Sequence, residues 1–158
     1  MKEIKLTQGK FALVDDEDFD ELNKFKWYAQ GGANSFYARR DISNNGKRYR
    51  ILMHRKILGL TNPNIHCDHV NNNGLDNQKS NLRGCTVSEN LRNSKPFINS
   101  TSKYKGVSFY KRDNKWRAQI MIDGKETHLG YFKDEIEAAK VYDKAAKVHH
   151  KEFAYKNF

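Results

Sequence analysis

Asp68 and His69 are adjacent, Asn81 follows His69 by twelve residues, and Asn90 follows Asn81 by nine. Carboxylate and amide oxygens are hard donors that suit Mg²⁺, which keeps several water ligands and needs only one or two from the protein. A histidine with an ordinary pKa near ~6.5 can accept a proton from water at neutral pH. We therefore expect one divalent cation, Mg²⁺ or Mn²⁺, on Asp68 and Asn90, beside His69 as the general base of a phosphodiester hydrolysis.

Two short strands and a helix must bring these side chains together. The pattern predicts a strand at residues 65–70, a polar loop rich in asparagine, and a second strand at residues 82–87 that leads into a helix. Thr86 and Glu89 have the spacing of a capping box, which places Asn90 in the first helical turn. The alternative is that the histidine and the amides only satisfy the hydrogen bonds of a tight loop.

His69 could also belong to a second set of donors, which consists of His66, Cys67, His69 and Cys85. Their spacing matches no familiar zinc motif, so a mixed zinc site is an alternative that the pattern does not favour. A disulfide is not expected in a reducing compartment. We expect both thiols to be buried, opposite one another on the paired strands.

The chain of 158 residues has a formal net charge of +10 and a pI near 9.6. Residues 15–21 hold six of the 19 acidic residues, which favours a helix start over a calcium loop with spaced ligands. Residues 22–112 hold 17 Lys and Arg against four Asp and Glu, which favours a polyanion such as double-stranded DNA. Charge alone leaves RNA binding and simple solubility open.

Aromatic residues make up 12% of the chain, which argues against disorder although the mean hydropathy of −0.92 is strongly polar. No apolar run approaches the ~20 residues that span a bilayer, and the first residues lack the apolar core of a signal peptide. A folded cytoplasmic protein without a membrane segment is therefore expected.

The chain divides by composition into four sections with an α+β fold: residues 1–60, 61–93, 94–103 and 104–158. The first is predicted to be a small β-rich scaffold with a hairpin that turns at Asn45 and Gly46. The second holds the strands and the helix of the candidate site. The third is polar and typical of a linker, which would reach about 33 Å if fully extended.

The last section is predicted to be a three-stranded antiparallel sheet packed on one helix, with strands at residues 106–112, 115–122 and 126–132 and the helix at residues 134–150. Asp134 and Glu137 have capping-box spacing. The middle strand should place one face on the helix and the other in solvent: Trp116, Ala118, Ile120 and Ile122 against Arg117, Gln119 and Met121. The apolar stripe of the helix is predicted to contain Ile136, Ala138, Ala139, Tyr142, Ala145, Ala146 and His149.

Residues 68–90, DHVNNNGLDNQKSNLRGCTVSEN, resemble the HNH nucleases with a ββα-metal fold, and MHRKILG upstream is similar to the homing endonucleases of that group. The resemblance implies a metal-dependent DNA endonuclease of the kind found in phages and bacteria, which nicks or cleaves at preferred sites. Asn77 is expected to support the loop. The roles that the resemblance implies are metal ligands for Asp68 and Asn90, the general base for His69, and for Asn81 the bracing of the loop and the orientation of His69.

Most of the last section resembles the ethylene-response-factor, or APETALA, DNA-binding domain through GV, KW, LGYF, EAAKVYDKAA and the closing NF. That family lays its three-stranded sheet in the major groove. Base preference cannot be transferred, because Ser108 and Met121 stand where the family often has arginine and His128 where it has tryptophan. The residues that would face DNA are Lys105, Lys111, Arg112, Arg117, Gln119, Lys125 and His128.

The rival interpretation is a sequence-specific DNA-binding regulator with a catalytically inactive nuclease fold. One centre hydrolyses one strand at a time, so a monomer is expected to nick DNA. A double-strand break would need a homodimer or sequential binding. The sequence leaves the oligomeric state open.

Overall fold

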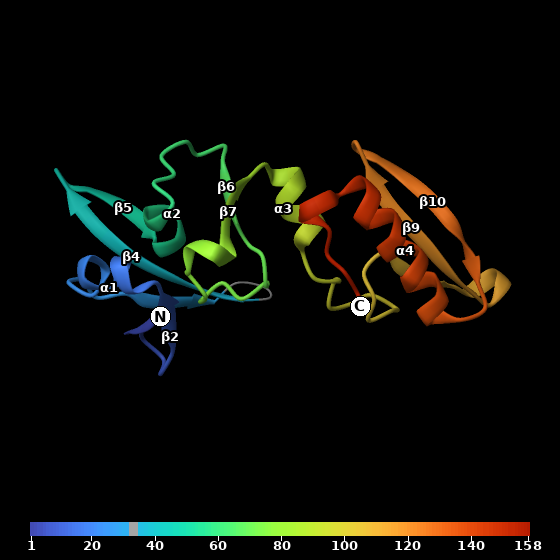
Figure 1. Ribbon diagram of the computed structural model, residues 1–158, viewed down its shortest axis with the longest axis horizontal. Coiled ribbons are helices and arrows are strands. Elements are labelled where there is room, and N and C mark those ends of the chain that lie inside the picture. The colour runs from blue at the N-terminus through green and yellow to red at the C-terminus, as the bar shows by residue number, and fades with distance from the viewer. Residues whose placement is uncertain (32–34) are drawn as a thin grey trace. The chain divides into compact units, whose positions relative to one another are not determined.

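The computed structural model describes residues 1–31 and 35–158. It separates into two compact units, residues 1–90 and 91–158, and each contains helices and small antiparallel sheets (Figure 1). The predicted mixture of helices with several small sheets is confirmed. In the part of the chain that the structure describes, each helix is too short or too polar to span a lipid bilayer.

The first unit begins with seven short elements: β1 (Lys2–Lys5), β2 (Phe11–Val14), α1 (Asp16–Leu22), β3 (Tyr28–Gly31), β4 (Phe36–Asn44), β5 (Lys47–Leu52) and α2 (Met53–Ile57). β1 pairs with β2, and β3, β4 and β5 form a second sheet in that order. The acidic run forms the start of α1, where carboxylates interact favourably with the helix dipole.

The turn between β4 and β5 confirms the predicted hairpin. Asn45 and Gly46 have φ angles of 49° and 74°, a left-handed conformation that these two residue types adopt with little strain. The hairpin leads directly into α2, whose first residue, Met53, is fully buried in the apolar core of this unit together with Trp27. Because α2 starts inside the core, its second residue, His54, is also buried.

The strands and the helix predicted around the asparagine cluster are present as β6 (His66–His69), β7 (Leu82–Cys85) and α3 (Val87–Asn93). β6 and β7 lie side by side and antiparallel (Figure 1). Asp68 is opposite Arg83 in this pair. The loop between them is attached to β2, because the backbone of Leu13 exchanges hydrogen bonds with Leu75 and Asn77 at 2.9 and 2.8 Å. The scaffold therefore fixes the segment that follows His69.

The second unit contains β8 (Val107–Tyr110), β9 (Lys115–Ile122), β10 (Lys125–Phe132) and α4 (Glu135–His149), and its sheet has the order β10-β9-β8. α4 lies across one face of this sheet (Figure 1). Asp134 caps α4 by accepting a hydrogen bond from the Glu137 amide at 2.8 Å. Small side chains such as Ala118, Ala138 and Ala139 are fully buried at the contact, so the predicted packing of helix on sheet is confirmed.

The ends of the predicted helix stripe need correction. Ile136 and His149 are exposed, because the sheet covers only the middle turns of α4. The next residue, His150, is buried instead, and its Nε2 lies 2.7 Å from the carbonyl oxygen of Met121 on β9.

The segment at residues 94–103 does not have the extended form that the reach of about 33 Å assumed. Its first residue, Ser94, accepts a hydrogen bond from Lys105 at 2.7 Å. Near its other end, the Ser102 hydroxyl donates to Glu135 at 2.7 Å. Both ends are thus bound within the second unit, and the intervening Phe97 is 86% exposed.

Two glycines give a matched test of packing in the second unit. Gly106 has φ +75°, and a Cβ there would lie 2.0 Å from the Tyr142 ring and 2.8 Å from the carbonyl oxygen of Gln119. Gly124 has φ +79° in the turn before β10, and a Cβ there would meet nothing within 4 Å.

We expect Gly124→Ala to lower the free energy of unfolding by about 1–2 kcal/mol, the backbone strain alone. Gly106→Ala should cost about 1–3 kcal/mol more, because the added methyl group displaces the Tyr142 ring from the core. Urea unfolding followed by circular dichroism measures both. Equal losses for the two variants would contradict the tight approach of Gly106 to α4.

Candidate functional site

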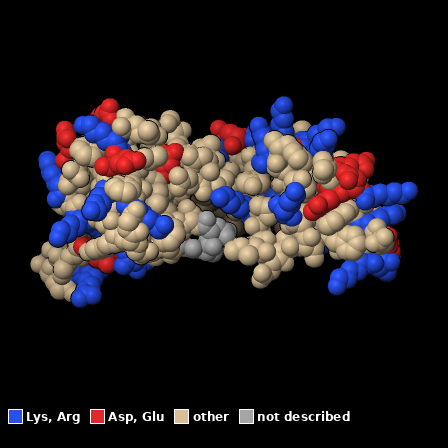
Figure 2. Space-filling view, turned by 90° about the horizontal axis from the view of Figure 1, so that it is seen from below, with Lys and Arg blue, Asp and Glu red and all other residues tan. Residues whose placement is uncertain are grey.

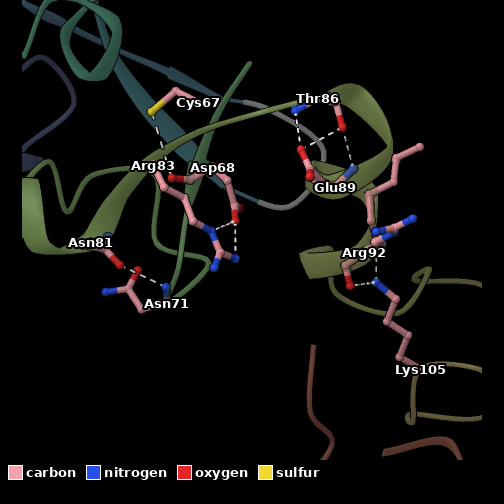
Figure 3. A network of polar contacts seen from close by, with 10 residues as sticks. Cys67, Asp68, Asn71, Asn81, Arg83, Thr86, Glu89, Arg92 and Lys105 are labelled. Atoms are coloured by element: carbon pink, nitrogen blue, oxygen red, sulfur yellow. Dashed lines mark hydrogen bonds and ion pairs between the residues drawn. The ribbon is translucent and has the colours of Figure 1, made fainter. Parts of the chain in front are cut away.

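The amide of Asn81 closes the loop between β6 and β7. Its Oδ1 accepts from the Asn71 backbone amide at 2.9 Å, and its Nδ2 donates to the carbonyl oxygen of Asp76 at 2.8 Å. Figure 3 shows the Asn81 side chain directed at Asn71. Asn71 continues the network, since its own side chain donates to the Asp76 carboxylate at 2.7 Å. The asparagine side chains therefore satisfy backbone groups of a tight loop, and the role of Asn81 in catalysis stays a prediction.

Asn77 lies deeper than Asn81. It is fully buried, and its Nδ2 donates to the carbonyl oxygen of Leu75 at 3.1 Å. A hydrogen bond with the Asn77 side chain also acts on the pKa of His69. The Asn81 side chain bonds to the backbone of Asn71 and Asp76. Asn77 is therefore better placed than Asn81 to orient His69.

His69 is 6% exposed at the end of β6. Burial lowers the pKa of its imidazole below the usual 6.5, while the Asn77 hydrogen bond and the charges of Asp68 and Asp76 oppose the shift. The ring is therefore neutral at neutral pH. A neutral imidazole can take a proton from water, which is the state that a general base needs.

Two aromatic rings that the sequence did not single out contact His69. His54 from α2 is 5.0 Å from the His69 ring, centroid to centroid, and nearly perpendicular to it. Tyr37 from β4 lies 5.8 Å from His69 and 5.7 Å from His54. The MHRKILG motif contains His54, but only the tertiary fold brings this helix to β6.

Asp68 is 4% exposed and ion-paired. Its cross-strand neighbour Arg83 donates to Oδ2 through Nε at 2.8 Å and through Nη2 at 2.6 Å (Figure 3). A guanidinium that holds a carboxylate through two donors fixes its position strongly. A cation bound by Asp68 would therefore share this carboxylate with Arg83.

Asn90 occupies the first turn of α3, as predicted. Thr86 Oγ1 accepts from the Glu89 amide at 3.2 Å, and Glu89 Oε2 accepts from the Thr86 amide at 2.8 Å, which completes the capping box (Figure 3). The Asn90 amide then donates to the Thr86 carbonyl oxygen at 3.0 Å, and the residue is half-buried. Its role as a metal ligand stays a prediction.

The donor set decides which metal would fit. Among the residues that the structure describes, no group of three or more His, Cys, Asp and Glu is placed to hold a metal ion. The zinc alternative therefore lacks its ligand cluster. The buried carboxylate of Asp68 and the amide of Asn90 are oxygen donors of the kind that Mg²⁺ prefers, and their joint use as ligands stays a prediction.

The two cysteines are offset by one position rather than opposite one another. Cys67 pairs with Gly84 and Cys85 with His66, because the register is set by Asp68 and Arg83. Burial raises the pKa of Cys67 to about 12 and that of Cys85 to about 11. Both thiols stay protonated at neutral pH, but only Cys85 is buried as expected, because Cys67 is half-buried.

In the second unit, one face of the sheet carries three of the residues predicted to face DNA. Arg117 and Gln119 alternate with Ala118, which packs under α4, so they lie on the opposite face. His128 is directly across from Gln119. The His128 ring also lies 4.6 Å from that of Tyr131, which the sequence had not indicated.

The other predicted contacts lie at the edges of this face or away from it. Lys111 and Arg112 form a short helical turn after β8, and Lys125 begins β10. Arg112 is exposed, with its guanidinium 5.6 Å from the Tyr110 ring and bonded to Asp113. These three side chains thus belong to the two turns of the sheet.

Lys105 is engaged inside the second unit. Its Nζ donates to the carbonyl oxygens of Leu91 and Ser94 at 2.8 and 2.7 Å. It also donates to the carbonyl oxygen of Arg92 at 2.7 Å (Figure 3). The end of α3 leaves such carbonyls without helical partners, and a cation there also interacts favourably with the helix dipole. The ammonium therefore caps a helix, and a phosphate contact of Lys105 would require these bonds to open.

On the face in Figure 2, Lys and Arg side chains lie in separate groups among uncharged residues, with fewer groups of Asp and Glu, and do not form one unbroken patch. The net charge of +10 favours a polyanion in general. The sheet face of the second unit is a more specific candidate for the surface that binds a polyanion.

No family model matches the chain. Over 150 residues it is 28% identical to an uncharacterised HNH endonuclease of Acanthamoeba polyphaga mimivirus, a match that covers 95% of this chain and 76% of the relative. Over 46 residues, 29% of this chain, it is 44% identical to APETALA2-like protein 2 of Oryza sativa and to an AP2-like ethylene-responsive transcription factor of Arabidopsis thaliana. These matches span only 11% and 10% of the plant proteins. The chain is thus similar to one nuclease-named protein over nearly its whole length and to plant transcription factors over a short segment.

Proposed function

We propose that this protein is a metal-dependent DNA endonuclease of the HNH type that hydrolyses phosphodiester bonds at preferred sites, as homing enzymes do. The observation that carries the proposal is the neutral, buried His69 at the end of β6, next to Asp68 and held by a loop that asparagine amides brace. The similarity to the mimivirus protein over 95% of the chain supports it.

Each residue of the candidate site has a separate role in the proposed reaction. His69 takes a proton from the attacking water, and Asn81 keeps the loop after β6 closed so that the imidazole does not move. Asp68 and Asn90 would hold the cation, with Arg83 fixing the carboxylate. A bound Mg²⁺ or Mn²⁺ supplies neutralisation of the negative charge that develops on the scissile phosphate and the departing oxygen.

The second unit would bind double-stranded DNA through the sheet face that carries Arg117, Gln119 and His128. A sheet of this width fits the major groove, where arginine and glutamine can read base edges. The partial similarity to the plant transcription factors supports this assignment. One hydrolytic centre per chain makes nicking the expected reaction of a monomer.

A second candidate function is a DNA-binding regulator without hydrolysis. The ion pair of Asp68 with Arg83 favours it, because a carboxylate already neutralised by a guanidinium has less charge to offer a cation. This regulator would bind DNA tightly and leave supercoiled plasmid intact with Mg²⁺ or Mn²⁺. The nuclease is preferred because His69 keeps the neutral state of a base.

His69→Ala should lower the rate of plasmid nicking with Mg²⁺ by about 10²–10⁴-fold, the usual contribution of a general base. The matched control is His66→Ala at the other end of β6, which should keep nearly the wild-type rate. Conversion of supercoiled to open-circular DNA measures both. Equal rates for His69→Ala and the wild type would refute the base, and an inactive wild type that still binds DNA would support the regulator.

Asn90→Ala should reduce nicking on the order of 10–100-fold at low Mg²⁺ through weaker cation binding, with partial recovery at higher Mg²⁺. Asn90→Asp should recover more, since it restores an oxygen donor. Ser88→Ala, on an exposed position of the same helix, is the control and should not change the Mg²⁺ dependence. An Asn90→Ala curve that coincides with the wild type at every Mg²⁺ concentration would remove Asn90 from the ligand set.

A further inference from the structure

His54 is a buried histidine for which the proposed reaction has no role. It is 6% exposed at the start of α2, and it stands edge against face with His69, at 5.0 Å between centroids and 86° between planes. Tyr37 contacts both rings, which makes a cluster of three. The ring of the candidate base, His69, is therefore packed against a second imidazole.

Burial of the polar His54 ring costs free energy of folding. Among the described residues, Nδ1 of His54 is buried without a hydrogen-bond partner. Burial above all, and then the charges of His69 and Arg55, lower the pKa of His54 to about 3, so the ring is neutral at physiological pH. A phenylalanine would place a planar ring, somewhat larger, at this position without a buried polar atom. A destabilising group kept next to a candidate base indicates a use in function.

The loop between β6 and β7 packs tightly against Tyr37. A Cβ on Gly74 would lie 2.5 Å from the carbonyl oxygen of Phe36 and 2.6 Å from the Tyr37 ring, so the loop between β6 and β7 presses directly on β4. The Gly74 amide also donates to Ser35 Oγ at 2.9 Å. The loop thus holds Tyr37 against the two histidines.

We propose that His54 is a positioning residue for His69, whose polar ring edge keeps the base in the orientation that hydrolysis needs. The inference rests on the proposed nuclease function. A phenylalanine at this position would keep a planar ring, of somewhat larger volume, and remove the nitrogen atoms. The melting temperature of the variant reports on the added volume, and the nicking rate reports on the loss of the polar edge.

The test compares the wild type, His54→Phe and Ile57→Ala. The last variant removes packing from the same helix at a residue that contacts the apolar core. Single-turnover nicking with Mg²⁺, DNA affinity in EDTA and the melting temperature are measured for each, with nicking assayed well below the lowest melting temperature.

We expect His54→Phe to melt at a higher temperature than the wild type, with a gain that grows as the pH falls below 6.5, because the wild-type ring resists protonation in the fold and phenylalanine has none to protonate. Its nicking rate should fall about tenfold or more, as for a misplaced catalytic group, with DNA affinity unchanged. Ile57→Ala should melt at a lower temperature and nick at the wild-type rate.

Wild-type nicking by His54→Phe would overturn the inference, because the ring would then only fill the core. A His54→Phe variant that loses melting temperature and rate together would also overturn it, since the role would be structural. An inactive wild type would refute the nuclease function itself and this inference with it. An active wild type with an unaffected variant refutes only the role of His54.

Discussion

The candidate site depends on a loop whose backbone is satisfied by side-chain amides. The chain leaves β6 after His69 and must return to β7 within twelve residues, between a buried strand pair and β2. Asn81 meets this constraint by accepting from Asn71 and donating to Asp76 with a single amide. Asparagine suits the task because its short side chain carries both a donor and an acceptor. These bonds hold the loop between the two paired strand ends, His69 and Leu82.

Buried polar groups then set the electrostatics of the site. The buried Asp68 is paired across the sheet with the half-buried Arg83, because a buried carboxylate without a partner is costly. His69 and His54 avoid that cost by staying neutral, which burial enforces on both. One ion pair and two uncharged imidazoles thus share a small interior. In the proposed reaction, the uncharged imidazole of His69 would be the proton acceptor.

Local signals in the sequence predicted most of the elements. Asn45-Gly46, the capping box at Thr86 and the alternation along β9 act over a few residues, so they can be read without a fold. Contacts that join distant elements could not be predicted in this way. The pairing of Arg83 with Asp68 requires the strand register, and the approach of His54 to β6 requires the packing of α2.

The hydrophobic periodicity of the sequence predicted buried positions less accurately at the ends of the elements. A 3.6-residue repeat placed His149 on the apolar stripe, but the chain leaves the helix there and turns His150 under the sheet. Lys105 shows a related limit, because a basic residue in a DNA-binding pattern can serve equally well as a helix cap. Residue type alone does not distinguish a phosphate from a row of carbonyl oxygens.

The anchoring of Ser94 and Ser102 within one unit has a practical consequence for handling the protein. The residues between them form a closed surface loop, with Phe97 and Ile98 at 86% and 80% exposure. Extending such a loop costs little, about 0.6 kcal/mol for each doubling of its length. Residues 95–99 are therefore a suitable position for a fluorophore or an affinity tag, because an insertion there would leave the sheet, α4 and the capped end of α3 in place.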